Sequence, residues 1–174
     1  MPHFSPEYFD TFRKKGFRPQ VVGCFLYEKR VLFLFKRKYA IWQFPQGGID
    51  NHETAEHALY REMREELSKS LARFKEDDAV YIGEDSVRFP FGKRGEKGLV
   101  TNEGKEMTMR GKQYFFYAIP VDTDTVSINK TEFDKYRWVS YIEAHDLIKS
   151  IYQRGKRRVI TQALKILYDK SYIR

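Results

Sequence analysis

Residues 47–69 read GGIDNHETAEHALYREMREELSK, and this stretch decides the fold of the chain. Its helical part carries an apolar residue at every fourth position, which is typical of an amphipathic helix that packs one face against a core. Asp50, Asn51 and Thr54 each offer a side-chain cap for the start of such a helix. The sequence therefore predicts a helix over residues 54–67 with a buried stripe made of Ala55, Leu59, Met63 and Leu67.

Three glutamates of this helix, Glu62, Glu65 and Glu66, are spaced i, i+3 and i+4, so their carboxylates crowd one side of a turn. Like charges this close destabilise a helix unless a positive group lies between them. Oxygen ligands suit Mg²⁺ or Mn²⁺, and Mg²⁺ is commonly shared with substrate phosphates. The alternative is a solvated, glutamate-rich helix face. Because Glu62 and Glu66 lie beside the apolar stripe, where desolvated carboxylates need compensation, the metal site is favoured.

The spacing of Gly47, Glu53 and the run from Arg61 to Glu66 resembles the Nudix box, the signature of the Nudix hydrolases. The resemblance implies an α/β fold in which a mixed β-sheet is sandwiched between α-helices. It also implies a Mg²⁺-dependent (or Mn²⁺-dependent) enzyme that cleaves phosphoanhydride bonds of nucleoside polyphosphates. Ser68 departs from the pattern, because the family has a helix-ending glycine there. The helix can therefore run on through Leu71, and the acidic residues are unaffected.

The resemblance further implies roles for the residues of the box. Glu53 and Arg61 are expected to brace the loop against the helix through an ion pair. The implied metal ligands are three carboxylates and one backbone carbonyl, those of Glu62, Glu65, Glu66 and Gly47.

A general base has to reach the attacking water. Glu132 is the distal candidate, since relatives carry an acidic metal ligand or base in the loop before the last strand. The alternative for Glu132 is an ordinary carboxylate of a surface loop. Glu65 or Glu66 could serve as the base instead, and the sequence does not choose between them.

Two further segments narrow the subfamily. Residues 42–50, WQFPQGGID, resemble a segment shared by bacterial RNA 5′-pyrophosphohydrolases and plant-type diadenosine polyphosphate hydrolases, and residues 132–141, EFDKYRWVSY, resemble the former. Asp50 is closer to the dinucleotide hydrolase version. In this subfamily, basic residues on the strand before residue 42 contact phosphates, which points to Lys36 or Arg37. Weaker pocket candidates are Gln43, Lys112 and Gln113.

The expected activity is therefore removal of pyrophosphate from the 5′-triphosphate end of RNA. Asymmetric hydrolysis of dinucleoside polyphosphates such as diadenosine tetraphosphate is the close alternative. A catalytically inactive Nudix module that binds RNA or nucleotides is a third, against which the presence of all three box glutamates argues. The formal charge of +8 also favours a polyanionic partner, either a nucleotide polyphosphate or RNA.

Length and composition predict one globular domain. The chain has 174 residues, 41% of them hydrophobic and 16% aromatic, which excludes general disorder. We expect a loosely attached extension over residues 1–15 and a single Nudix domain over residues 16–174. No apolar run approaches the ~18 residues that span a bilayer, so no membrane partner is expected. No secretory signal is visible, so the predicted location is cytoplasmic. Cys24, inside an apolar run, is expected in the core.

The remaining elements follow from hydrophobic periodicity and turn residues. Residues 91–112 are glycine-rich and charged without periodicity, which is typical of a mobile or functional loop. Phe89 and Phe91 beside it could stack a base, the alternative being a place in the core. Predicted strands cover residues 21–27, 31–35, 41–44, 80–83, 87–89, 114–121 and 136–139, and predicted closing helices cover 142–151 and 159–168.

Overall fold

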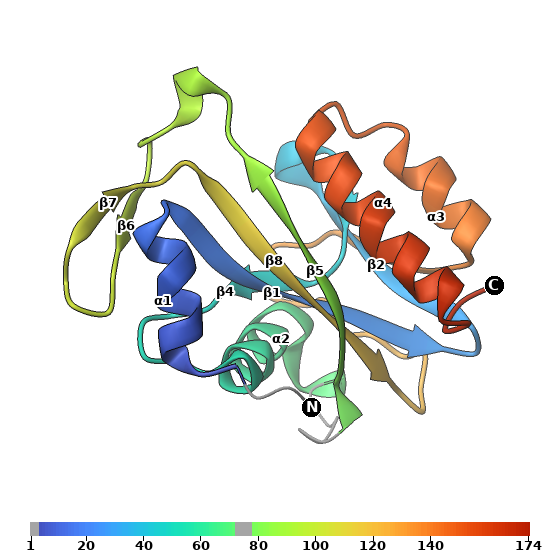
Figure 1. The fold of residues 1–174 in the computed structure, drawn as a ribbon. Coiled ribbons are helices and arrows are strands. Elements are labelled where there is room, and N and C mark those ends of the chain that lie inside the picture. Colours follow the sequence, from blue (N-terminus) through green and yellow to red (C-terminus); the bar gives the residue numbers. More distant parts are fainter. Residues whose placement is uncertain (1–3, 72–77) are drawn as a thin grey trace.

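The computed structural model describes residues 4–71 and 78–174, and its elements form three layers (Figure 1). One mixed sheet lies in the middle, with α1 and α2 on one face and α3 and α4 on the other. In chain order the elements are α1 (Pro6–Lys14), β1 (Phe17–Tyr27), β2 (Arg30–Lys36), the 3-10 helix η1 (Arg37–Tyr39), β3 (Ile41–Gln43), β4 (Gln46–Gly48), α2 (Ala55–Leu71), β5 (Val80–Arg88), the 3-10 helix η3 (Phe91–Lys93), β6 (Gly98–Val100), β7 (Glu106–Thr108), β8 (Gly111–Pro120), β9 (Lys135–Val139), α3 (Tyr141–Ile148) and α4 (Arg154–Asp169).

Within the described residues, seven strands form the main sheet in the order β3-β2-β1-β8-β5, with β4 also paired to β1 and β9 to β2. β1 and β8 run parallel at its centre, with Val21 opposite Phe115, and the other pairs are antiparallel. Helices cover both faces of these central strands, which is why both read as nearly continuous apolar runs. Cys24 of β1 is fully buried, and burial raises the pKa of its thiol. The predicted mixed sheet between helices is confirmed.

Helix α2 is held against the sheet by its apolar stripe. The four stripe residues are at most 2% exposed, and they pack on the face of β1 that presents Val21 and Phe25. Burying a side chain such as Leu59 or Met63 stabilises a protein by about 1.5–3 kcal/mol. The helix continues past Ser68 to Leu71, as expected without a glycine at its end.

Two expectations about the segment after α2 are wrong. The two short strands expected over residues 80–89 are one strand, β5, whose pairing with β8 is interrupted by a bulge between Tyr81 and Gly83. The loop expected over 91–112 contains the antiparallel pair β6–β7. Phe91 is 85% exposed, so it lies outside the core, with the Arg94 guanidinium 3.9 Å from the centre of its ring.

The N-terminal segment is also more firmly attached than expected. Residues 6–14 form α1, in which Phe9 is fully buried and packs edge-on against Phe115 of β8, with ring centres 5.1 Å apart. Ser5 caps the helix by accepting a hydrogen bond from the Tyr8 N–H. Loose attachment is therefore wrong for this helix, while the domain boundary at residue 15 stays a prediction.

A buried arginine joins α1 to the loop after β4. The Arg13 side chain is 2% exposed and donates hydrogen bonds to the carbonyl oxygens of Ile49 at 2.7 Å and Asp50 at 2.9 Å. Its own turn supplies the Asp10 carboxylate, 3.8 Å away, and that carboxylate also accepts from the Asn102 N–H. Helix α1, the loop after β4 and the β6–β7 hairpin therefore meet at one hydrogen-bonded junction.

In the described part of the chain, no helix combines the length and the apolar character that crossing a membrane requires.

The first prediction concerns Arg13. In Arg13→Met, the Asp10 carboxylate and two loop carbonyls lose a buried partner, so the free energy of unfolding should fall by about 3 kcal/mol. Urea denaturation followed by circular dichroism measures this. Lys14→Met, at a half-exposed ion pair with the same Asp10, is the matched control and should change stability far less. Equal losses in both variants would show that burial of the guanidinium is not what stabilises the junction.

Candidate active site

A cleft of about 440 Å³ opens at one end of the sheet. It is lined by residues from both central strands, from β2 to β4, from α2 and from the start of α4. Its carboxylates and cations come from positions spread along the sequence. The carboxylates belong to Glu62, Glu66 and Glu132, and the cations to Arg18, Lys36, Lys97, Lys112 and Lys156.

One wall of the cleft is formed by two glutamates of α2. Glu66 accepts a hydrogen bond of 2.8 Å from the backbone N–H of Gln46. Burial raises the pKa of Glu66 well above its usual range, and although that N–H lowers it, the neighbouring carboxylates of Glu132 and Glu62 raise it further. Burial also raises the pKa of Glu62. This wall therefore holds negative charge only at a cost, which a cation in the cleft would offset.

Strand β4 approaches α2 so closely that a side chain at residue 47 would not fit. A Cβ atom at Gly47 would lie 1.8 Å from Cδ of Glu62. The predicted bracing pair lies beside this contact: Arg61 donates to both carboxylate oxygens of Glu53, at 3.0 and 2.7 Å. The same guanidinium donates to the Gly48 carbonyl at 2.9 Å and to Glu62 at 2.7 Å. The loop and the helix are thus fixed to each other through one arginine.

The other two predicted acidic residues lie differently. Glu65 is exposed and lines a separate hollow on the outside of α2, together with His57 and Arg64. Glu132 lines the cleft, half-exposed, with its carboxylate 2.5 Å from Nζ of Lys36. The structure therefore brings Glu62, Glu66 and Glu132 to one cleft.

The predicted phosphate-binding residues separate in the same way. Lys36 lines the cleft and is largely buried. Arg37, the next residue, is exposed and turns to Asp134, with 3.3 Å between Nε and the carboxylate. Gln43 is buried in the cleft wall and accepts a hydrogen bond of 2.8 Å from Nζ of Lys156. Of the pair Lys36 and Arg37, the lysine is the one that faces the cleft.

Several lining residues were missed as individual site residues from the sequence, among them Arg18, Lys97, Gln153 and Lys156. One signal was available. Arg18 pairs with Lys112 across the parallel strands β1 and β8, and residues directly opposite each other share a face of the sheet. Lys156 carried no such signal, because its approach to Gln43 bridges 113 residues of sequence.

The surroundings of the buried lysines in the cleft disfavour their charged forms. Burial, and to a smaller extent repulsion from Arg18, Lys97 and Lys36, lowers the pKa of Lys112 to about 8. Burial also lowers the pKa of Lys156 to about 8, with repulsion from Lys112 contributing. A polyanion bound between these lysines would favour their charged forms.

The donor set suits a hard divalent cation. Carboxylate oxygens are the ligands that Mg²⁺ and Mn²⁺ prefer, and Glu62 and Glu66 present them close to the Gly47 backbone. Across residues 4–71 and 78–174, no three His, Cys, Asp or Glu side chains already form a group that could hold a metal ion. Two α2 glutamates therefore offer a partial site, to which substrate phosphates can add oxygens.

Comparison with known proteins decides the family. The family model described as "NUDIX domain" matches residues 17–162. The chain belongs to the NUDIX family.

Two relatives and one solved structure are similar to this NUDIX chain over most of its length. An RNA pyrophosphohydrolase of Pasteurella multocida is 31% identical, over 88% of this chain and 77% of the relative. An RNA pyrophosphohydrolase of Mannheimia succiniciproducens is 34% identical, over 90% of this chain and 78% of the relative. A NUDIX hydrolase from Nitrosomonas europaea has a similar solved structure, with a TM-score of 0.59 at 15% identity, covering 90% of this chain and 92% of that one.

The second prediction concerns Gly47, where β4 lies against α2. In Gly47→Ala, the new Cβ displaces the Glu62 carboxylate or the loop, and misplacement by about 1 Å can cost about 100-fold in rate. We expect a loss of that order in the hydrolysis of a nucleoside polyphosphate, measured as pyrophosphate or phosphate release. Gly92→Ala is the control, since no heavy atom lies within 4 Å of its added Cβ. Full activity of Gly47→Ala would mean that the close contact is not required.

Proposed function

We propose that this NUDIX chain hydrolyses the 5′-triphosphate end of RNA, releasing pyrophosphate and leaving a 5′-monophosphate. One observation carries the proposal: two α2 glutamates face five cations across a single cleft. This arrangement suits a substrate that brings several phosphates, together with a divalent cation bound by carboxylates. Relatives at 31% and 34% identity bear the name RNA pyrophosphohydrolase, which favours RNA as the molecule that carries the phosphates.

The chain's own residues would act mainly by positioning. Lys36, Lys112 and Lys156 would neutralise the phosphate oxygens and hold the polyphosphate along the cleft. Glu62 and Glu66, with the Gly47 carbonyl, are the proposed ligands of Mg²⁺ or Mn²⁺. Glu65, exposed outside the cleft, is proposed as a third ligand that joins them when its side chain turns toward the cation. When bound, the cation supplies charge neutralisation at the reacting phosphates and makes water more acidic.

The reaction needs one proton acceptor. The oxygen of water forms a bond to phosphorus, the bond from that phosphorus to the bridging oxygen breaks, and pyrophosphate leaves with the bonding electron pair. A carboxylate accepts the proton from the water. Glu132 is supported by its position in the cleft, where its carboxylate lies 2.5 Å from Nζ of Lys36. Glu65 and Glu66 stay the alternative bases.

The third prediction tests the proposed function. Purified protein with Mg²⁺ is given 5′-triphosphorylated RNA and diadenosine tetraphosphate side by side, and we expect the higher kcat/KM for RNA. Glu66→Gln should lose about 100-fold or more in kcat while staying folded, because a charged group at the reacting phosphates is lost. Glu65→Gln tests whether the exposed glutamate takes part. A strong preference for the dinucleotide would assign the cleft to dinucleoside polyphosphates, and undiminished turnover in Glu66→Gln would refute the site.

The fourth prediction concerns pH. Lys112 and Lys156 carry charge below pH 8 and lose it above, since the pKa of each is about 8. As pH rises from 7 to 9, kcat/KM should therefore fall by about tenfold or more, mainly through weaker binding. The variant Lys112→Arg/Lys156→Arg keeps its charge over this range and should have a flatter profile. An equally steep fall in that variant would attribute the pH dependence to another group.

A further inference from the structure

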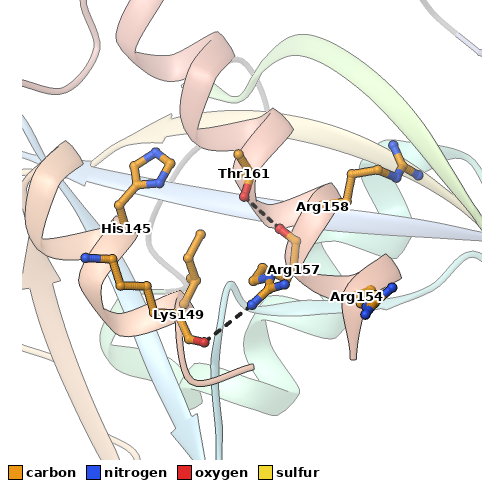
Figure 2. A pocket seen from close by; sticks show the side chains of 7 residues that line it. His145, Lys149, Arg154, Arg157, Arg158 and Thr161 are labelled. Carbon is orange, nitrogen blue, oxygen red and sulfur yellow. Dashed lines mark hydrogen bonds between the residues drawn. The ribbon is translucent and has the colours of Figure 1, made fainter. Parts of the chain in front are cut away.

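A second hollow, of about 440 Å³, lies between the end of α3 and the first turns of α4 (Figure 2). We call it the α3–α4 hollow. Four of its lining residues are basic: Lys149, Arg154, Arg157 and Arg158. A basic surface is by itself usually a solvated face. Two further observations distinguish the α3–α4 hollow from a solvated face. They concern the compensation of its charges and its position beside the cleft.

The four cations differ in how their charge is compensated. Lys149 lies 2.6 Å from the carboxylate of Asp146, and Arg158 lies 2.5 Å from that of Asp85. Within residues 4–71 and 78–174, neither Arg154 nor Arg157 has a carboxylate within 4 Å. Arg157 instead points toward α3 and donates to the backbone carbonyl of Lys149 (Figure 2). Two guanidinium charges of the hollow are therefore available to an anion.

The α3–α4 hollow and the cleft are lined by neighbouring residues at the start of α4. Gln153 and Lys156 line the cleft, and their sequence neighbours Arg154 and Arg157 line the hollow. One helical turn rises about 5.4 Å, so the two surfaces meet across the N-terminal turn of α4. That turn contains no acidic residue, and a helix N-terminus is itself positively polarised. An anionic strand leaving the cleft here meets only favourable charge from this helix.

We propose that the RNA strand downstream of the 5′ end crosses the first turn of α4 and binds by its phosphates to Arg154 and Arg157 in the α3–α4 hollow. This inference rests on the proposed function, because only an RNA substrate has a strand to bind. Guanidinium groups suit phosphate, which they can contact through two parallel N–H donors. Contacts to backbone phosphates carry no sequence information, so the affinity of this surface would depend on the length of the RNA and not on its sequence.

The experiment compares substrates of two lengths. Triphosphorylated dinucleotide and triphosphorylated RNA of roughly twelve nucleotides are given to the wild type and to Arg154→Gln/Arg157→Gln, at several salt concentrations. The matched control is Lys165→Gln/Lys170→Gln, which removes the same charge from the other end of α4. Urea unfolding verifies that both variants are folded. Binding of the monophosphorylated twelve-nucleotide RNA is measured in parallel by fluorescence anisotropy.

We expect the arginine variant to bind the longer RNA on the order of tenfold more weakly and to lose about 1.4 from the slope of log affinity against log salt, the value for two phosphates. Its kcat/KM should fall for the longer RNA alone, and the control should match the wild type. The proposal is overturned by an equal loss in the control, by an equal loss on the dinucleotide, or by no loss at all. It is also overturned if the variant loses binding to poly-L-glutamate but not to RNA, which would indicate an acidic protein partner. A wild type that hydrolyses neither substrate refutes the proposed function itself.

Discussion

The contact between the Glu62 carboxylate and the backbone at Gly47 is the constraint on which the rest of the site depends. Because residue 47 has no side chain, α2 can lie directly against β4. Arg61 then joins Glu53, the Gly48 carbonyl and Glu62 in one set of hydrogen bonds. Strand β4 is positioned in turn by its pairing with β1. The acidic wall is thereby fixed to the centre of the sheet.

Burial opposes both signs of charge in the cleft. It raises the pKa of Glu66 and lowers the pKa of Lys112 and Lys156, so each group is shifted toward its neutral form. The attraction between these groups is therefore smaller than the cost of removing them from water. A divalent cation beside the glutamates and phosphates beside the lysines would reverse both shifts. The free cleft is accordingly suited to ligands of both charges bound together.

The sequence specifies the parts of this molecule that have a local pattern. The four-residue apolar period of α2, the spacing of its glutamates and the apolar runs of the long strands are visible over short windows, and the structure agrees with the elements they predict. The β6–β7 hairpin was missed because its strands have three residues each, too few to show alternation. The firm attachment of α1 was missed because a buried Arg13 depends on carbonyls of a distant loop.

The same reasoning explains the site. Glu62 and Glu66 were predictable because their neighbourhood is one helical turn, whereas Lys156 reaches Gln43 only through the packing of α4 on the opposite face of the sheet. Arg37 shows why the sequence alone could not select the cleft residue. It is adjacent to Lys36 and also basic, but its side chain lies at the surface, paired with Asp134. Distinguishing the two requires the position of β9 beside β2, which no short window contains.

The acidic and the basic residues of the cleft belong to different elements, and this has a consequence for specificity. Two of its three carboxylates lie within residues 47–66, whereas its cations come from β1, β2, the hairpin segment, β8 and α4. The acidic wall can stay the same while the cationic wall changes, since different elements build them. Under the proposed function, the reaction type would depend on α2 and its loop, and the phosphate-bearing substrate would be selected by elements outside the box. Among these, α4 extends beyond the cleft, so it is the element best placed to distinguish a long anionic substrate from a short one.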